Sequence, residues 1–312
     1  MDYRYVHVDV FTDRQFEGNQ LAVFPQPQDL TAAQMQRIAN EMAFSESTFI
    51  LPAEAGGDVR MRIFTPADEL PIAGHPTIGS TFALAAEEVI ARGREQFVFE
   101  LGVGPVPVAL EWGVDGLAFA WMTQPLPTFG GSVRDRAALA RGVGLEPADL
   151  AGDLPAQVVS CGVPFLFVAL AARAAVDAVA IDRKALARCC RESGLDELPV
   201  FFFTPERGAG PETVYSRMLA PGFGIAEDPA TGAASGPLGC YLLRHGLVGA
   251  DQAAAVLSLQ GVAMGRPSRI HISIDSRAGE ITRVRVGGTS VLVGEGVIRL
   301  TESRDRASSP GR

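Results

Sequence analysis

PIAGHPTIGSTFALA, residues 71–85, joins a turn of glycine, histidine and proline to a run of small and apolar residues. Glycine and proline mark the boundaries of regular elements, so this stretch predicts a loop that leads into an apolar helix. His75 lies where that helix begins. This position is compatible with a metal ligand, part of a phosphate-binding loop, a catalytic base or a simple helix start.

The surroundings of this stretch occur twice in the chain. RIFTP, residues 62–66, is matched 155 positions later by RMLAP, residues 217–221. At the same offset IAGHPTIGS (72–80) falls opposite EDPATGAAS (227–235), and a helix of small and apolar residues follows each. GNQLAVF near the N-terminus likewise resembles GVPFLFVAL in the second half. Three matches in the same order predict a duplicated unit.

Two similar units that face each other would place a small-molecule site between them. Loops 71–79 and 224–233 would then approach this site from opposite sides. Each precedes a helix and therefore offers unpaired backbone N–H groups and the positive end of a helix dipole, a suitable receptor for a carboxylate. The alternative is that glycine and proline only turn the chain into a helix.

Apolar residues with period two predict strands, and a 3.6-residue period predicts a helix over 31–42 with Thr31 as its N-cap. TQPLPTFGG, residues 123–131, is a connector rich in proline and glycine, after which the pattern restarts. The strands of the first half are expected at 5–11, 21–24, 47–52, 59–66, 97–100, 106–111 and 117–122.

Composition excludes several classes of protein. The chain has 312 residues, 47% of them hydrophobic, a net charge of −9 and a pI of about 5.0. An acidic chain with scattered arginines is not expected to bind nucleic acid. No run of 18 uncharged apolar residues predicts a membrane span, and the first residues predict a strand and not a signal peptide. We expect a cytoplasmic protein.

Phosphate-loop and metal chemistry lack the residues they need. GHPTIGS has the two glycines of a phosphate loop without its lysine, and no G-x-G-x-x-G follows a strand here. His7, His245 and His271 lie in unrelated segments, so no metal site is predicted. The cysteines form no C-x-x-C pair, which argues against zinc and against a disulfide framework; they are Cys161, Cys189, Cys190 and Cys240.

Three ionisable residues are candidates for proton chemistry. Glu46 lies between Phe44 and Phe49, and burial among apolar groups would raise its pKa toward neutrality. His75 titrates near neutral pH without help. Asp228 lies at the entry to the second apolar helix. The alternatives are a solvent-facing strand glutamate for Glu46, a helix-start residue for His75, and an N-cap or first-turn acid for Asp228.

Five blocks, in this order and spread over the chain to about residue 300, resemble the PhzF family of phenazine-biosynthesis-like isomerases. They are VDVFTDRQFEGNQLAVF, FSESTFI, RIFTPADELPIAGHPTIGS, EDPATGAASGPLGCYLL and QGVAMGRPSRI. The resemblance implies the α+β fold of diaminopimelate epimerase. In this fold two pseudo-symmetric domains each curl a mainly antiparallel sheet around a central helix, here the helices after residues 76 and 232.

The expected domains are 1–122 and 123–289, with a last strand near 290–300 that returns to the first domain and a disordered tail at 302–312. The epimerase relatives use one cysteine at each helix start. The 155 offset puts those positions near Ala73 and at Asp228–Pro229, and neither holds a cysteine. A two-thiol racemase is therefore disfavoured.

The family's chemistry implies a cofactor-independent isomerase of trans-2,3-dihydro-3-hydroxyanthranilate. Glu46 would take a proton from a ring carbon and return it elsewhere on the same face. His75 and Asp228 would hold polar groups of the substrate and assist the proton transfer. The predicted substrate-binding residues, with backbone N–H groups of the last two receiving the carboxylate, are Asn19, Gly74, Gly232 and Ala233.

One position departs from the family pattern. The phenazine enzymes have a motif that resembles DPATGSA, and Ala233 replaces its serine here. The backbone donor survives this change, and the hydroxyl donor does not. The alternatives are an epimerase or racemase of a small amino or hydroxy acid and a non-catalytic small-anion-binding protein. The expected partner is a small carboxylate, and the expected assembly is a homodimer.

Overall fold

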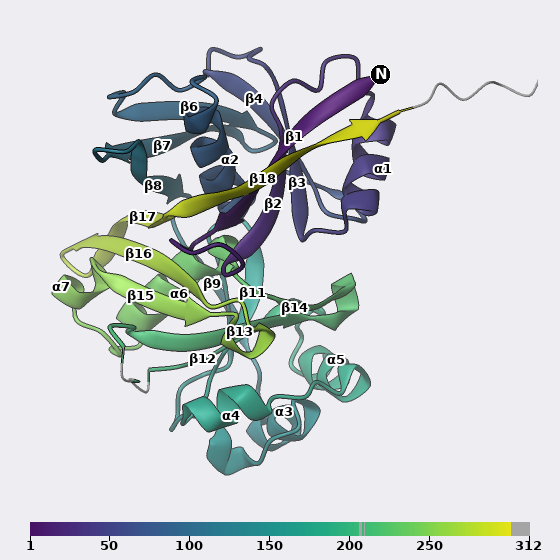
Figure 1. Cartoon of the computed structure of the whole chain (residues 1–312). Coiled ribbons are helices and arrows are strands. Elements are labelled where there is room, and N and C mark those ends of the chain that lie inside the picture. The colour runs from purple at the N-terminus through teal and green to yellow at the C-terminus, as the bar shows by residue number, and fades with distance from the viewer. Residues whose placement is uncertain (206–207, 209, 301–312) are drawn as a thin grey trace, which may run out of the picture.

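The computed structural model describes residues 1–205, 208 and 210–300. The predicted tail, 302–312, lies outside the described residues. Strands outnumber helices among the described elements and pair into a large mixed sheet, so the fold is α+β, as predicted (Figure 1). No helix in the described ranges is both long and apolar enough to cross a bilayer.

The first half of the chain contains eight strands and two helices. In chain order they are β1 (Asp2–Val10), β2 (Asn19–Phe24), α1 (Ala32–Met42), β3 (Glu46–Pro52), β4 (Val59–Phe64), β5 (Glu69–Leu70), α2 (Gly74–Ala86), β6 (Gln96–Leu101), β7 (Gly104–Trp112) and β8 (Leu117–Gln124).

The second half has the same order with additional helices. It comprises β9 (Thr128–Ser132), α3 (Arg136–Gly142), η1 (Pro147–Asp149), β10 (Gln157–Ser160), β11 (Pro164–Ala169), α4 (Arg173–Ala178), α5 (Arg183–Glu192), β12 (Val200–Thr204), β13 (Val214–Ala220), η2 (Pro221–Phe223), β14 (Ile225–Asp228), α6 (Gly232–Arg244), α7 (Ala250–Ala253), β15 (Val256–Gln260), η3 (Val262–Met264), β16 (Ser268–Arg277) and β17 (Glu280–Gly288). The chain then continues into β18 (Ser290–Arg299).

The two halves pair their strands in the same way. The first half reads β18-β1-β2-β3-β4-β6-β7-β8, with β5 added to β4. The second reads β9-β10-β11-β12-β13-β15-β16-β17, with β14 added to β13. The pairs β2–β3 and β11–β12 are parallel, as are the pairs β4–β6 and β13–β15. The other pairs within each half are antiparallel. The duplication read from the sequence is thus a duplication of topology.

Two connections join the halves. β8 pairs with β17, so the sheets are continuous, and β18 returns to pair with β1 along almost its whole length (Figure 1). The division into domains at residue 122 stays a prediction, since the sheet runs through that point.

Each sheet curls around one buried helix. α2 contacts β1, β2, β3, β8 and β18, strands from both ends of the first-half sheet, and α6 contacts β10, β11, β16 and β17. Residues 74–84 of α2 are all buried, and in α6 nearly every residue from 232 to 242 is. A helix that is apolar and small on every side can only be accommodated inside a fold.

The first residues of α2 and α6 differ from the predicted ones in two details. α2 begins at Gly74 and not after residue 76, so His75 lies within the first helical turn. α6 begins at Gly232, which is 158 positions later and not 155. The extra residues belong to η2 and β14. The equivalence is visible in the helices themselves, since Thr77 and Ser235 each donate to the carbonyl four residues back.

Candidate functional site

Asn19 and Glu46 are brought together by two parallel strands. Asn19 is the first residue of β2, and Glu46 is the first residue of β3 and pairs in register with Leu21. α1 has a capping box at Thr31, as its sequence predicts, and ends at Ala43 in the left-handed conformation (φ 53°). That turn directs the chain into Ser45 and Glu46. The two polar side chains therefore start from the same edge of the sheet.

His75 enters this edge from the start of α2. The residue is 3% exposed, and its Nε2 lies 3.1 Å from Oε2 of Glu46, whose side chain is 13% exposed. These two atoms do not form an aligned hydrogen bond, and neither has another partner. Glu46 is therefore not a solvent-facing strand residue. The pair keeps one acceptor and one ring nitrogen free for a bound molecule.

Asp228 reaches the same place from the second half, at the end of β14. Its Oδ1 accepts from Asn19 Nδ2 at 2.8 Å and from Ser45 Oγ at 3.2 Å, and its Oδ2 accepts from Thr231 Oγ1 at 2.6 Å. Thr231, and not Asp228, is the N-cap residue of α6. The N-cap interpretation of Asp228 is therefore wrong, and its carboxyl group is oriented by three donors.

Two amides organise the polar groups around Asp228. Asn19 Nδ2 donates also to Ala230 O at 3.1 Å and lies 3.3 Å from His75 Nδ1, so it connects the two halves. Gln260, at the end of β15, donates to Asp228 O at 2.8 Å and to Thr231 Oγ1 at 2.9 Å. Buried polar groups cost free energy unless they are paired, and these amides satisfy most of this cluster.

The starts of the two central helices touch through glycine. A Cβ on Gly74 would lie 2.6 Å from the Cα of Gly232, and a Cβ on Gly232 would lie 2.9 Å from the Cα of Gly74. Neither helix has a side-chain N-cap hydrogen bond. Ala233 is the second residue of α6, as His75 is of α2. Two uncapped helix starts thus meet at one point, with the N–H groups that such ends leave unpaired.

Burial sets the protonation of the three ionisable groups. Burial, and then the nearby charge of Asp228, raise the pKa of Glu46 well above its ordinary value. Burial raises the pKa of Asp228 to about 6, although hydrogen bonds from Thr231, Asn19 and Ser45 act in the opposite direction. Burial lowers the pKa of His75 to about 3, so the imidazole is neutral at physiological pH.

The described residues include no group of three or more His, Cys, Asp or Glu side chains that could hold a metal ion. Two cavities of about 610 and 690 Å³ hollow the first half elsewhere, one beside Arg60 and Arg62 and one beside Trp112. Neither includes a residue of the polar cluster. The candidate site is therefore distinguished by its converging polar groups.

The structure brings all the predicted site residues to one junction between the halves. They are Asn19, Glu46, Gly74, His75, Asp228, Gly232 and Ala233. Ser45, Thr231 and Gln260 are polar partners in this cluster that were not among the predicted residues. Ser45 and Thr231 are next to candidate residues in the sequence, and Gln260 is the first residue of the last block that resembles the PhzF family. These positions are the signal by which the sequence could have indicated them.

Comparisons with known proteins identify relatives along nearly the whole chain. The family model PhzC-PhzF, described as phenazine biosynthesis-like protein, matches residues 8–296. A relative from Pseudomonas fluorescens named trans-2,3-dihydro-3-hydroxyanthranilate isomerase is 39% identical over 298 residues, which cover 96% of this chain and 100% of the relative.

Solved structures show the same fold. A Bacillus anthracis phenazine biosynthesis protein of the PhzF family superposes with a TM-score of 0.85 at 25% identity, covering 96% of this chain and 100% of that one. A probable proline racemase from Agrobacterium radiobacter has a TM-score of 0.66 at 14% identity, covering 97% and 94% of the two chains. The predicted epimerase-like fold is therefore confirmed.

Proposed function

This chain belongs to the phenazine biosynthesis-like PhzC-PhzF family, and on that premise we propose that it is a cofactor-independent isomerase. Its substrate would be a small cyclic carboxylate such as trans-2,3-dihydro-3-hydroxyanthranilate, the compound in the name of the Pseudomonas fluorescens relative. The reaction would move one proton from one ring carbon to another. A dihydro ring with conjugated double bonds needs no cofactor for such a migration.

The observation that carries this proposal is the pair of unpartnered atoms on Glu46 and His75. Glu46 Oε2 and His75 Nε2 are buried, face each other at 3.1 Å and have no aligned hydrogen bond. A buried polar atom without a partner is costly, and binding of a polar or acidic hydrogen beside it removes that cost. Glu46 is the group with access to a proton on a ring carbon.

Glu46 has the properties of a reversible proton carrier. Burial and the charge of Asp228 raise its pKa well above its ordinary value. A carboxyl group whose pKa approaches the working pH both takes and returns a proton readily. In the proposed reaction its carboxylate removes the proton from one carbon, and the resulting carboxylic acid delivers the same proton to another carbon on the same face.

His75 assists as a neutral imidazole, because burial lowers its pKa to about 3. A neutral ring can accept or donate at Nε2 without placing a full charge in the site. Asp228 is bound by three donors, which fix its carboxyl group beside the Glu46–His75 pair, where its charge would orient polar groups of the substrate. The carboxylate of the substrate would bind to backbone N–H groups at Gly232 and Ala233.

Transfer on a single face is favoured over epimerisation by the placement of these groups. Glu46 and His75 both come from the first half and lie side by side. An epimerase needs two proton carriers on opposite faces of the substrate carbon. Asp228 is the ionisable group of this cluster contributed by the second half, and its oxygens are committed to Asn19, Ser45 and Thr231.

The proposal is tested by incubating the protein with trans-2,3-dihydro-3-hydroxyanthranilate in deuterated water. We expect turnover by the wild type, with solvent deuterium in the product to the extent that Glu46 exchanges its proton. Glu46→Gln should lower kcat by about 10²–10⁴-fold, the usual contribution of a general acid–base group. Equal activity of the two proteins would exclude Glu46 as the proton carrier.

Ala233 supplies a second arm of this experiment. Ala233→Ser restores the hydroxyl of the phenazine motif at the second residue of α6. A hydrogen bond of about 1–3 kcal/mol to an anion should lower KM for this substrate by about 5–150-fold. Ala233→Gly keeps the backbone donor without the hydroxyl and serves as the control. If neither the wild type nor Ala233→Ser turns the compound over, the substrate belongs to another class.

A homodimer in the cytoplasm stays part of this proposal. Light scattering coupled to size-exclusion chromatography should give twice the mass of the 33.0 kDa chain. A monomer mass across the working concentration range would contradict the dimer without bearing on the chemistry.

A further inference from the structure

The loop that ends at Asn19 is longer than its counterpart in the second half. Residues 11–18 connect β1 to β2, whereas residues 161–163 connect the equivalent strands β10 and β11. Asn19 directly follows this longer loop, and its amide connects Asp228 and Ala230 to the His75 ring. Asn19 pairs with Val10 at the end of the β1–β2 ladder, so residues 11–18 adjoin the strand end that carries this amide.

Apolar burial holds only the first residue of this loop, Phe11, whose side chain is fully buried in the first-half core. Phe11 (φ 64°) and Phe16 (φ 70°) adopt the left-handed conformation, which is unfavourable for residues with a side chain. Phe16 is 70% exposed, so the tip of the loop has no apolar anchor. Beyond Phe11, polar contacts constrain the loop.

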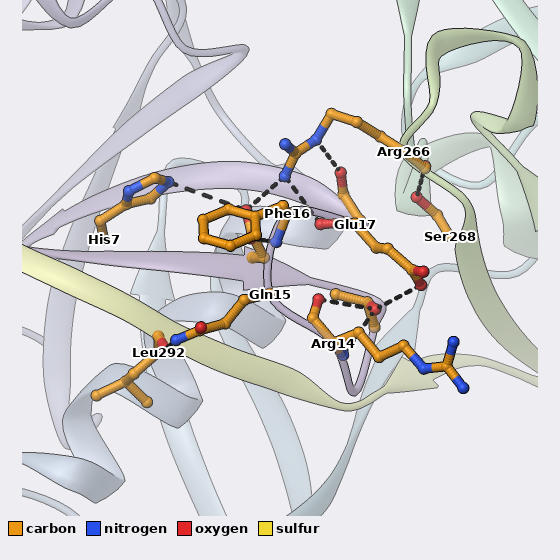
Figure 2. Close-up of polar contacts among 11 residues, drawn as sticks. His7, Arg14, Gln15, Phe16, Glu17, Arg266, Ser268 and Leu292 are labelled. Carbon is orange, nitrogen blue, oxygen red and sulfur yellow. Dashed lines mark hydrogen bonds and ion pairs between the residues drawn. The ribbon is translucent and has the colours of Figure 1, made fainter.

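Arg266 of the second half makes the contacts nearest to Asn19. Its Nε donates to Gly18 O at 2.7 Å, and its Nη2 donates to Glu17 O at 2.8 Å and to Asp9 Oδ1 at 2.5 Å. The other oxygen of Asp9 accepts from Phe16 N at 2.6 Å. Figure 2 shows the Arg266 side chain extending across to the loop at Glu17. Three successive loop residues are thus fixed by one buried ion pair.

Arg266 is itself tied to the support of Asp228. Arg266 N donates to Gly261 O at 3.1 Å, and a Cβ on Gly261 would lie 2.5 Å from Pro229 O, so this turn packs against the strand end that carries Asp228. Gln260, which holds Asp228 and Thr231, begins the same turn. One end of the turn therefore orients Asp228, and the other end orients the loop that delivers Asn19.

We propose that Arg266, paired with the 1%-exposed Asp9, is a positioning residue that acts on the reaction through Asn19. This inference rests on the proposed isomerase function for its kinetic consequences only. Arg266 contacts neither Glu46 nor His75 in the contacts described here. Its effect is to hold Gly18, and with it the Asn19 amide, within hydrogen-bond distance of Asp228.

The kinetic test compares Arg266→Lys with Asn19→Ala and with the double variant. Lysine keeps the charge and loses the fork that grips two carbonyls and a carboxylate at once. Displacement of a site group by about 1 Å lowers rates by up to about 10²-fold, so Arg266→Lys should lower kcat at least tenfold. The double variant should be no slower than Asn19→Ala. Additive losses would overturn the proposal.

Arg136→Lys is the matched control. Arg136 also donates to two backbone carbonyls of a loop, those of Gly152 and Leu154, and contacts no residue of the site. We expect its kcat to match the wild type within twofold and its effect to add to that of Asn19→Ala. A loss equal to that of Arg266→Lys would show that any loosened loop slows this enzyme, which would overturn the specific role.

A second readout needs no activity. Carbon-13 NMR of the Asp228 carboxyl group follows its titration directly. Asn19, Ser45 and Thr231 donate to this carboxyl group, and Glu46 and Glu227 are the charges near it. Loss of the Asn19 donor disfavours the ionised form. The pKa of Asp228 should therefore rise by the same amount in Arg266→Lys and Asn19→Ala and stay unchanged in Arg136→Lys.

These readouts separate the two proposals. If the wild type isomerises nothing, the proposed function fails, and the NMR titration still tests Arg266. An unchanged Asp228 pKa in Arg266→Lys overturns the positioning role whatever the activity. If Arg266→Lys does not fold, Asp9→Asn with Arg266→Gln replaces the ion pair by two neutral amides, so that neither charge is left without its partner. This variant should fold and show the same pKa rise.

Discussion

At the scale of single residues, burial decides the chemistry of the candidate site. Glu46 and His75 are ordinary titratable groups whose pKa values move in opposite directions for the same reason, since a low-dielectric environment disfavours charge of either sign. The sequence placed Glu46 between two phenylalanines, which correctly suggested burial. It could not show that His75 Nε2 faces Glu46 Oε2, because 29 residues and two strands separate them.

A pH-dependent gain in stability should accompany removal of Glu46. Its folded pKa lies above the unfolded one, so the folded state binds more protons in that window and stability falls as pH rises through it. Glu46→Gln removes this loss. Relative to wild type, the variant should gain little at pH 4 and about 1 kcal/mol, or roughly 2 °C in Tm, at pH 8. Calorimetry across this range is the measurement.

Glu197→Gln is the control, and its effect on stability should change with pH in the opposite direction. Its hydrogen bond to Arg183 lowers the pKa of Glu197, so the stability it contributes is present above the unfolded pKa and lost as pH falls. That variant should lose stability relative to wild type as pH rises. A Glu46→Gln gain that does not depend on pH would point to packing and not to proton linkage.

At the scale of elements, the contact between the starts of α2 and α6 shapes the site. Gly74 and Gly232 are so close that neither position has room for a Cβ. The sequence predicted an apolar helix in each half, and both helices are present, although much of each predicted loop is helix or strand. The predicted offset between the two helices was 155 positions and the observed one is three longer, because η2 and β14 lengthen the connection that precedes α6. Matching letters at a constant offset cannot detect an insertion between matched blocks.

Gly74→Ala should therefore destabilise the protein despite the higher helix propensity of alanine. Propensity alone predicts a gain of about 1 kcal/mol at a helical glycine. The added Cβ would lie 2.6 Å from the backbone of Gly232 and would force the helix starts apart, at a cost of about 1–3 kcal/mol, with loss of activity. Thermal unfolding and kcat are the measurements.

Gly294→Ala is the matched control for this substitution. Gly294 lies in β18, and nothing lies within 4 Å of the position of its Cβ. It should be neutral or slightly stabilising. If Gly74→Ala behaved in the same way, the close approach of the two helices would not be a constraint.

At the scale of the whole molecule, two strand pairings make one body of two similar halves. β17 pairs with β8 from Val284 to Gly288, and β18 returns from the C-terminal region to β1 (Figure 1). Asn19 and Arg266 add polar contacts across the same junction. The site therefore depends on both halves being folded together.

We expect heat to unfold the two halves in a single transition, although each has its own apolar core. A shared sheet couples their stabilities, so the calorimetric and van't Hoff enthalpies should agree. Gly287→Val is a sharp probe, because a Cβ at Gly287 would lie 2.6 Å from Ala120 O across the β8–β17 pairing. It should lower the single Tm and not split it. Two transitions in either protein would show independent halves.

The resemblance to the PhzF family implied the α+β class, and the sequence by itself determined the duplicated order of elements, the two apolar helices and the polar residues at their starts. These features follow from local patterns of hydrophobicity, turns and spacing. Only the tertiary structure decided which side chains meet. Asn19 bonds to Asp228 across 209 positions, and Arg266 holds Gly18 across 248. Such pairings arise from strand register and from the return of distant strands, which no local pattern encodes.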